Sequence, residues 1–134
     1  MNRFSRSLGL LVLCAALPGC GGDGLVNLQG KVSLDGQPLE RGTIRFVAAD
    51  GTGPSAETVI QAGTYTLALP AGKKQVSILG YNKIGEHHVT GPDSPLIDDL
   101  EQIVPPQYNE QTTLKRDVHA EGPASLDFEL KTSP

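Results

Sequence analysis

The sequence has no tryptophan, only two cysteines and few aromatic side chains, and each scarcity argues against a class of function. Three Tyr and three Phe supply the 4% aromatic content, which argues against a stacking platform for bases or sugars. The net charge of −4 comes without a basic stripe, so nucleic acid is not an expected partner. The 134 residues suffice for one domain and not two.

The amino-terminal residues differ from the rest of the chain. Arg3 and Arg6 precede an apolar run over residues 8–17. Ten residues are too few for a stable bilayer-spanning helix, which needs about 20. The run has the length of the apolar region of a signal peptide. Residues 1–19 are therefore predicted to be a signal peptide.

The segment Leu17-Pro18-Gly19-Cys20 resembles a lipobox, the processing signal of bacterial lipoproteins, although Pro18 is an unusual occupant of it. The resemblance implies that Cys20 becomes the new amino terminus and carries lipid, palmitate included, which anchors the chain to a membrane. By resemblance to lipoprotein sorting signals, Gly21 favours the outer membrane of the cell envelope. Two alternatives to a lipoprotein signal are an ordinary secretory signal peptide with an incidental Cys and an uncleaved anchor helix.

Processing at Cys20 changes what the mature chain can do. Cys14 leaves with the signal peptide, so no free thiol, disulfide, cysteine nucleophile or cysteine zinc site is expected. The two lost arginines leave nine basic against fifteen acidic side chains, a net charge of −6. Such a surface does not attract anionic lipid headgroups, so the lipid must supply the anchor. Residues 20–25 are expected to form the lipidated Cys and a flexible tether.

Short alternating segments separated by turn residues fill residues 26–132. Polar and apolar residues alternate over residues 26–35, and further strands are predicted at 43–48, 56–61, 64–69, 75–81, 112–118 and 125–131. The 16 Gly and 10 Pro fit many short strands, and no segment has a helical period. We expect an all-β domain, a seven-stranded antiparallel Greek-key β-sandwich of prealbumin-like or Ig-like type. The side chains expected in its core are Leu28, Val32, Ile44, Phe46, Tyr65, Leu67, Ile78, Leu126, Phe128 and Leu130.

The stretch 84–111 interrupts this rhythm and is predicted to be a long loop. It is rich in Pro, Gly and acidic residues, and a loop of this length in a compact domain is usually functional or disordered. Leu100, Ile103, Val104 and Tyr108 suggest that it packs back on the domain, where Pro105 and Pro106 would protect a sheet edge. A short helical turn is considered at 94–102, with Ser94 as its cap. The loop is either a binding site or a cover for a sheet edge, and the second is slightly favoured.

Residues 30–82 resemble the carboxypeptidase regulatory-like domain, a transthyretin-like (prealbumin-like) β-sandwich. The matching features are Gly30-Lys31-Val32, Leu34-Asp35-Gly36-Gln37-Pro38-Leu39, Gly63-Thr64-Tyr65-Thr66-Leu67, Leu69-Pro70-Ala71-Gly72 and Gly80-Tyr81. An Asp often precedes the Gly of the middle strand in this family, where this chain has Ala62. The lipobox, this domain and Pro105-Pro106-Gln107-Tyr108-Asn109 together resemble a class of short bacterial lipoproteins. The resemblance implies a non-catalytic accessory or adhesive module.

Neither the histidines nor the clustered acids form a recognisable metal or catalytic motif. Glu86, His87, His88 and His119 lack zinc spacing, and adjacent His side chains diverge in an extended chain. Asp93, Asp98, Asp99 and Glu101 supply oxygen ligands suited to Ca²⁺ but no EF-hand pattern. No G-x-S-x-G elbow occurs, although Tyr108 and Asn109 were considered as pocket residues. No catalytic residue, metal ligand or cofactor is predicted, and the chain is not expected to be an enzyme.

Two classes of function remain open. The first is a membrane-anchored envelope module that is structural or binds another envelope protein. The second is an accessory module that binds a carbohydrate or a metal ion in a pocket near Tyr81, Tyr108 and the acids of the 84–111 segment.

Overall fold

The structure, a computed structural model, describes residues 24–121 and 124–133 and is all-β. The predicted signal peptide 1–19, Cys20 and residues 21–23 of the predicted tether lie outside the described residues. A single 3-10 turn, η1 (Pro106–Tyr108), interrupts the strands. The strands are β1 (Leu25–Leu34), β2 (Gln37–Pro38), β3 (Arg41–Ala48), β4 (Ala56–Gln61), β5 (Thr64–Pro70), β6 (Gly72–His88), β7 (Leu96–Gln102), β8 (Lys115–Val118), β9 (Ala124–Ser125) and β10 (Phe128–Leu130).

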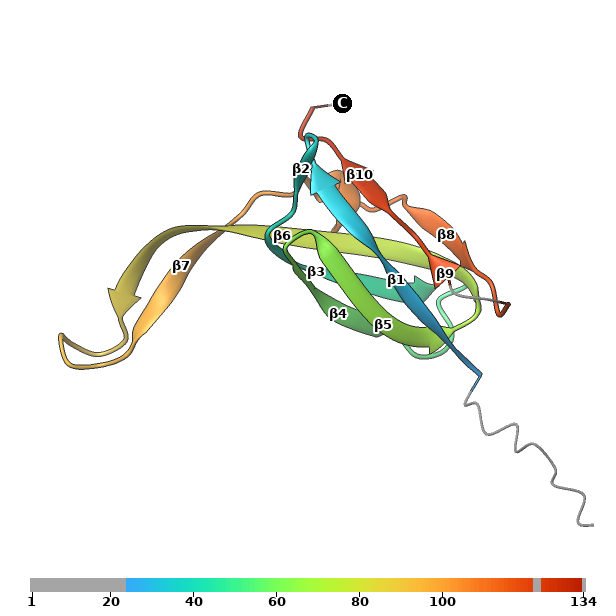
Figure 1. The fold of residues 1–134 in the computed structure, drawn as a ribbon, viewed down its shortest axis with the longest axis horizontal. Coiled ribbons are helices and arrows are strands. Elements are labelled where there is room, and N and C mark those ends of the chain that lie inside the picture. The colour runs from blue at the N-terminus through green and yellow to red at the C-terminus, as the bar shows by residue number, and fades with distance from the viewer. Residues whose placement is uncertain (1–23, 122–123, 134) are drawn as a thin grey trace, which may run out of the picture.

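One hydrogen-bonded sheet connects the strands, and it curls over on itself. Its order is β10-β1-β5-β4-β3-β6-β7, with β2 and β9 paired to β1 and β8 paired to β6. β4 and β5 share only the residue pair Gln61 and Thr64 beside their connecting turn, so the two strands diverge from there. The part of the sheet around β1 then faces the part around β3 and β6 (Figure 1).

The core lies inside this curl. The ring of Phe46 on β3 lies 6.2 Å from the ring of Tyr65 on β5 and 6.4 Å from the ring of Phe128 on β10. Three aromatic rings thus join strands that are far apart in the sheet order. The prediction of burial is confirmed for Leu28, Val32, Ile44, Phe46, Tyr65, Ile78, Phe128 and Leu130.

Two side chains expected in the core are only partly buried, Leu67 and Leu126. Leu67 lines an open hollow over the paired strands β1 and β5. Leu126 lies between β9 and β10, where its amide donates to the Gln29 carbonyl and its carbonyl accepts from the Tyr65 hydroxyl. The predicted strand 125–131 is interrupted at residues 126–127, where the Lys31 amide donates to Oδ1 of Asp127 (2.8 Å) and not to a backbone carbonyl.

The predicted strand count and the purely antiparallel pairing are wrong. The described residues form ten strands rather than seven, since short pairs such as β2 and β9 join the sheet. β9 and β10 pair with β1 in parallel, because the carboxyl-terminal segment runs beside β1 in the same direction. The predicted strand 112–118 begins only at Lys115.

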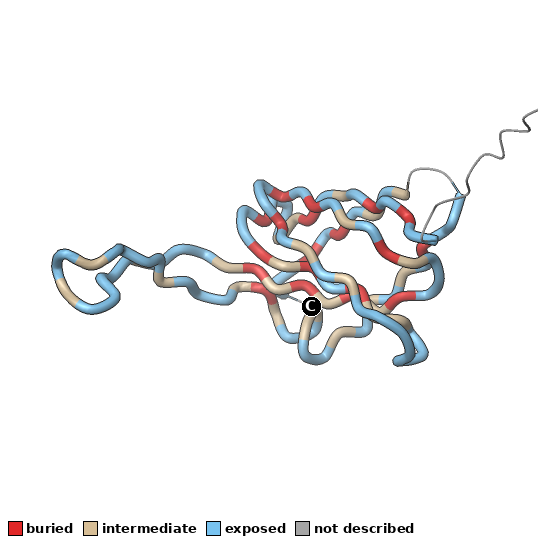
Figure 2. Tube along the Cα trace, turned by 90° about the horizontal axis from the view of Figure 1, so that it is seen from below, coloured by how far each residue is buried: buried red, intermediate tan, exposed pale blue. Residues whose placement is uncertain are grey.

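The predicted loop 84–111 is also wrong in form. β6 continues through residue 81 to His88, and β7 pairs back along it from Tyr81–Gln102 to His88–Leu96. The helical turn considered at 94–102 is strand β7, because its backbone groups pair with those of β6. The hairpin of residues 81–102, which we call the arm, extends away from the curled sheet and is mostly exposed (Figures 1 and 2).

The remainder of the 84–111 segment does pack on the domain as expected. Val104 is buried, and Ile103 and Tyr108 are partly buried against the core. Leu100 is 45% exposed, so the expectation that it packs back is wrong: it lies on the arm, where the sheet has only two strands.

Candidate functional site

The arm is the principal candidate for a functional site, since it stands away from the rest of the fold. It has three parts: the outer half of β6 (residues 81–88), the connecting turn 89–95, and β7. A bulge between Lys83 and Gly85 places Ile84 out of register, and Ile84 is 65% exposed. Bulges bend and twist a strand pair locally. The arm therefore departs from the curl of the sheet near the bulge.

A small charge network holds the base of the arm. Arg41 at the start of β3 donates from Nη1 to Oδ2 of Asp98 over 3.0 Å. Lys83 Nζ lies 2.9 Å from Asp98 Oδ1 and also forms an ion pair with Glu86. Hydrogen bonds from Lys83 and then Arg41 lower the pKa of Asp98, and those to Glu86 and Asp98 raise the pKa of Lys83. The network links the body to both strands of the arm.

The turn at the tip of the arm is closed by Ser94. Its Oγ accepts hydrogen bonds from the amides of Thr90 (3.0 Å) and Gly91 (3.2 Å) and donates to the Gly91 carbonyl over 2.7 Å. His88 Nδ1 lies 2.7 Å from the Ser94 carbonyl oxygen. Ser94, considered as a helix cap, instead satisfies the backbone of a hairpin turn.

The residues considered for metal binding do not converge. His87 Nδ1 lies 2.6 Å from Asp99 Oδ1, whereas the His88 ring is directed to Ser94. Asp98 and Asp99 are adjacent on β7, so their side chains leave opposite faces of the hairpin. His119 follows β8, away from the arm in sequence and pairing. Among the described residues, no three His, Cys, Asp or Glu side chains are grouped to hold a metal ion.

The residues considered for a pocket are engaged in structure. Asn109 donates from Nδ2 to the carbonyls of Ile78 (3.2 Å), Val104 (3.2 Å) and Pro105 (3.0 Å). The Tyr108 hydroxyl accepts from the Lys131 amide over 3.1 Å. These bonds hold η1 against β6 and against the end of β10, so both side chains have a structural role.

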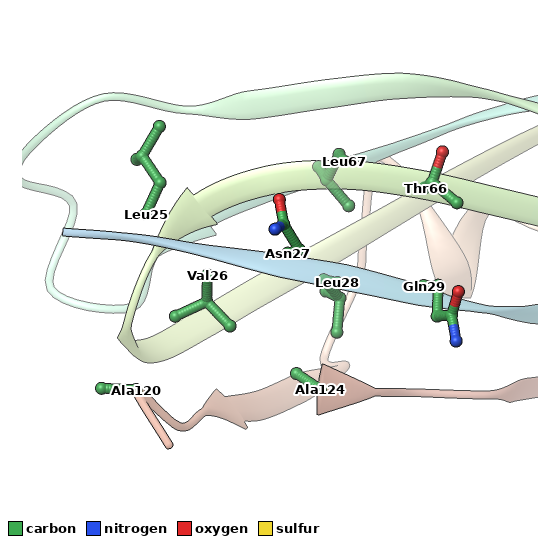
Figure 3. Close-up of a pocket in the computed structure, with 9 residues that line it drawn as sticks. All are labelled: Leu25, Val26, Asn27, Leu28, Gln29, Thr66, Leu67, Ala120 and Ala124. Carbon is green, nitrogen blue, oxygen red and sulfur yellow. The ribbon is translucent and has the colours of Figure 1, made fainter. Parts of the chain in front are cut away.

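A hollow of about 660 Å³ lies beside the amino-terminal half of β1 (Figure 3). Its lining alternates apolar and polar side chains, and none of them is charged or aromatic: Leu25, Val26, Asn27, Leu28, Gln29, Thr66, Leu67, Ala120 and Ala124. Such a lining offers no general acid or base and no ring on which a sugar would stack. The hollow therefore favours neither catalysis nor carbohydrate binding.

No family model, curated protein or solved structure matches this chain. Among the residues that the structure describes, no helix has the length and apolar character to cross a bilayer.

Sequence reasoning reached the segment that contains the arm but missed its form. A signal was available in Gly91-Pro92-Asp93-Ser94-Pro95, which is typical of a turn, between two segments of similar length. The flanking residues do not alternate cleanly, because both faces of the arm are in solvent and neither needs an apolar stripe.

Proposed function

We propose that this chain is a lipid-anchored cell-envelope protein, without catalytic activity, whose arm contacts another envelope protein. The anchor is the acylated Cys20, in a mature chain that begins there and is directed to the outer membrane. The observation that carries the proposal is the arm itself, a hairpin with exposed apolar side chains that the body does not cover.

Geometry supports this proposal in a second way. The amino-terminal end of β1 and the tip of the arm lie at opposite ends of the molecule (Figure 1). A protein tethered through residues just before β1 would therefore extend its arm away from the membrane surface. Burying exposed apolar surface is the main favourable term in association of proteins, and the arm is where such surface gathers.

The finer fold assignment belongs to the same proposal. We take the curled sheet as a prealbumin-like Greek-key sandwich of the carboxypeptidase regulatory-like kind. The supports are the resemblance over residues 30–82 and the facing of β1, β5 and β10 against β3 and β6. A domain of that kind would serve as a rigid scaffold for the arm.

The anchor is tested by changing Cys20→Ser, with Cys14→Ser as the matched control. We expect the Cys20→Ser variant to lose both palmitate labelling and its place in the membrane fraction. The Cys14→Ser variant should retain both. Retained labelling in the Cys20→Ser variant, or a mature amino terminus other than Cys20, would refute the anchor.

The role of the arm is tested by photo-crosslinking in cells. A photoreactive residue at Ile97, which is 45% exposed on β7, should crosslink to a discrete protein. The matched control is Val59, which is 57% exposed on β4 of the body. Equal crosslinking from both positions, or none from Ile97, would contradict a specific role for the arm.

A further inference from the structure

We propose that the free edge of β7 binds an extended segment of another protein, rich in basic and apolar residues, as an added antiparallel strand. This inference rests on the proposed role of the arm and names the chemistry of its partner. The proposed site is the outer edge of β7, and the mode of binding is the addition of a strand to the sheet.

The backbone of β7 is prepared for such pairing. β7 is the last strand in the sheet order, and no described strand pairs with its other edge. The Val89 amide donates to the Pro95 carbonyl at one end of the arm, and the Ile103 amide donates to Gly80 at the other. In an antiparallel ladder, every second residue directs its backbone amide and carbonyl to the neighbouring strand. The amides and carbonyls of residues 97, 99 and 101 therefore face β6. The amides and carbonyls of residues 96, 98, 100 and 102 therefore face outward.

Among the residues that the structure describes, exposed apolar side chains concentrate along the arm. Five of the seven large apolar side chains that the structure exposes lie there: Ile84, Val89, Leu96, Ile97 and Leu100. Three of these are on β7, where exposure is 56%, 45% and 45% in chain order. An open edge with exposed apolar side chains is a ready template for another strand.

The excess of acidic side chains on the arm indicates a basic partner. The arm has Lys83 as its one lysine against five acids, and Lys83 is already paired with Glu86 and Asp98. β7 alone contributes three of those acids and no base. Asp98 is also paired with Arg41 of the body, and Asp99 with His87. Glu101 makes no ion pair with any described residue, so five acids stand against Lys83 and Arg41. A segment that supplies basic side chains opposite β7 would be attracted, and an acidic one would be repelled.

The same charges oppose pairing with a second copy of this chain. Two β7 edges aligned antiparallel about Asp99 place the two Asp99 carboxylates opposite each other. The neighbouring registers that keep outward-facing residues opposite each other pair Asp98 with Asp98 or Asp99 with Glu101. Like charges directly across a strand pair are destabilising. The fitting occupant is therefore a different chain.

Cross-strand matching gives the partner's pattern. Apolar residues belong opposite Leu96, Ile97 and Leu100, and basic residues belong opposite the three acids. Read in its own direction, antiparallel to β7, such a segment runs Lys-Val-Lys-Lys-Val-Ile. The natural partner is expected to carry an exposed strand or an extended tail of this kind.

The test uses a fluorescent peptide containing Lys-Val-Lys-Lys-Val-Ile and the purified full-length protein, in detergent where it fractionates with membranes. Anisotropy should report saturable binding. A peptide with Glu in place of each Lys should bind at least about tenfold more weakly, because it meets the acids of β7. In the Glu101→Lys variant, the difference in affinity between the Lys peptide and the Glu peptide should become smaller or change sign.

Backbone pairing is tested separately from charge. Leu100→Pro removes an amide that faces outward and is not used by β6, so the arm should persist, as backbone NMR shifts would show. Peptide binding should fall at least about tenfold, since a ladder hydrogen bond is lost and the ring blocks the edge. The matched control is Leu100→Ala, which keeps the amide and should weaken binding less.

The outcomes separate the mode of binding from the role of the arm. Unchanged binding by Leu100→Pro would show attraction by charge alone and overturn the strand proposal, as would no binding of the peptide. Crosslinking from Ile97 in cells without peptide binding would keep the proposed role of the arm and reject this edge. Peptide binding without crosslinking would reject the role and keep the edge chemistry.

Discussion

Both halves of β6 are extended strand, but their surroundings differ. Residues 72–80 are flanked by β3 on one side and partly by β8 on the other, and Val76 and Ile78 are fully buried. Residues 81–88 pair only with β7, and none of them is buried. Backbone pairing continues along the strand, whereas side-chain burial ends near Gly80. The comparison shows that the body is held by packing and the arm by its ladder and a few ion pairs.

A two-stranded hairpin is marginally stable by itself, so the arm should be the first part to open. The body should instead unfold as one cooperative unit. Substitutions in the body should therefore change the global free energy of unfolding more than substitutions in the arm do.

Removing an aromatic ring from the body should have the largest effect. Phe128→Ala should cost about 3–5 kcal/mol of the free energy of unfolding, because Phe128 is buried against Phe46 and Tyr65. A small domain has about 5–15 kcal/mol in total. Urea unfolding followed by circular dichroism measures the loss of stability in the Phe128→Ala variant. A variant that unfolds at nearly the wild-type urea concentration would show that packing does not hold the body.

A matched pair of glycine substitutions compares the two regions directly. A Cβ on Gly30 would lie 1.8 Å from the Leu126 carbonyl oxygen, so Gly30→Ala must displace backbone and should cost about 1–3 kcal/mol. On Gly85 in the arm, a Cβ would meet only the end of the Asp99 side chain, at 3.2 Å, and no backbone atom. Gly85→Ala should stay within about 0.5 kcal/mol of wild type. Thermal melts of the two variants measure the loss of stability. Equal losses would contradict the difference between the tightly packed body and the open arm.

Tyr65→Phe should cost about 1–2 kcal/mol, because the hydroxyl donates to the Leu126 carbonyl over 2.6 Å and that acceptor loses its partner. Burial, and then the charge of Asp127, raises the pKa of Tyr65. The folded state thus holds this proton more tightly than the unfolded state, and stability should fall as the pH rises above about 10.

The alkaline effect is measured by urea unfolding of wild type and Tyr65→Phe at about pH 8 and about pH 11. The variant should lose less stability between the two values. A parallel decline in both proteins would exclude Tyr65 as its source.

Shortening the arm should leave the body intact. Replacing residues 83–100 by Asn-Gly joins Asn82 to Glu101, a directly opposed pair suited to a two-residue turn. The melting temperature should stay close to that of wild type, while peptide binding disappears. Collapse of the fold would show that the arm contributes to the core.

Acid should act on the arm locally. The lowered pKa of Asp98 means that its bonds to Lys83 and Arg41 stabilise the folded arm above the unfolded pKa of about 3.9 and are lost as the pH falls further. Asp98→Asn should mimic this at neutral pH. Backbone NMR relaxation should report faster motion over residues 81–102 and no change at Phe46. A change confined to the body would contradict the local effect.

Strand prediction succeeded where one face is buried and failed where none is. Residues 25–34 and 56–61 alternate because one side faces the core, and both strands were predicted to within a residue. The arm has solvent on both faces, so no periodic pattern marks it. Leu100 was wrongly expected to pack back, since an apolar side chain by itself does not indicate whether a neighbouring strand exists.

For the candidate site, sequence reasoning identified the segment and not the geometry. The acids of 93–101 looked like one cluster because they are close in sequence. Strand periodicity places Asp98 and Asp99 on opposite faces, one with Arg41 and Lys83 and the other with His87. The distinction depends on which backbone β7 pairs with, and that partner is set by the tertiary fold.

Local residue order determined the all-β class, the positions of the body strands and their turns. Asp35-Gly36 and Ala62-Gly63 adopt the positive φ values that a two-residue hairpin turn requires, and side-chain alternation chose the buried face of each strand. The tertiary fold sets the parallel pairing of β9 and β10 with β1, the curl of the sheet and, among the described residues, the open edge of β7. These depend on which distant segment lies beside each strand, and no local pattern encodes that choice because every backbone offers the same hydrogen-bonding groups.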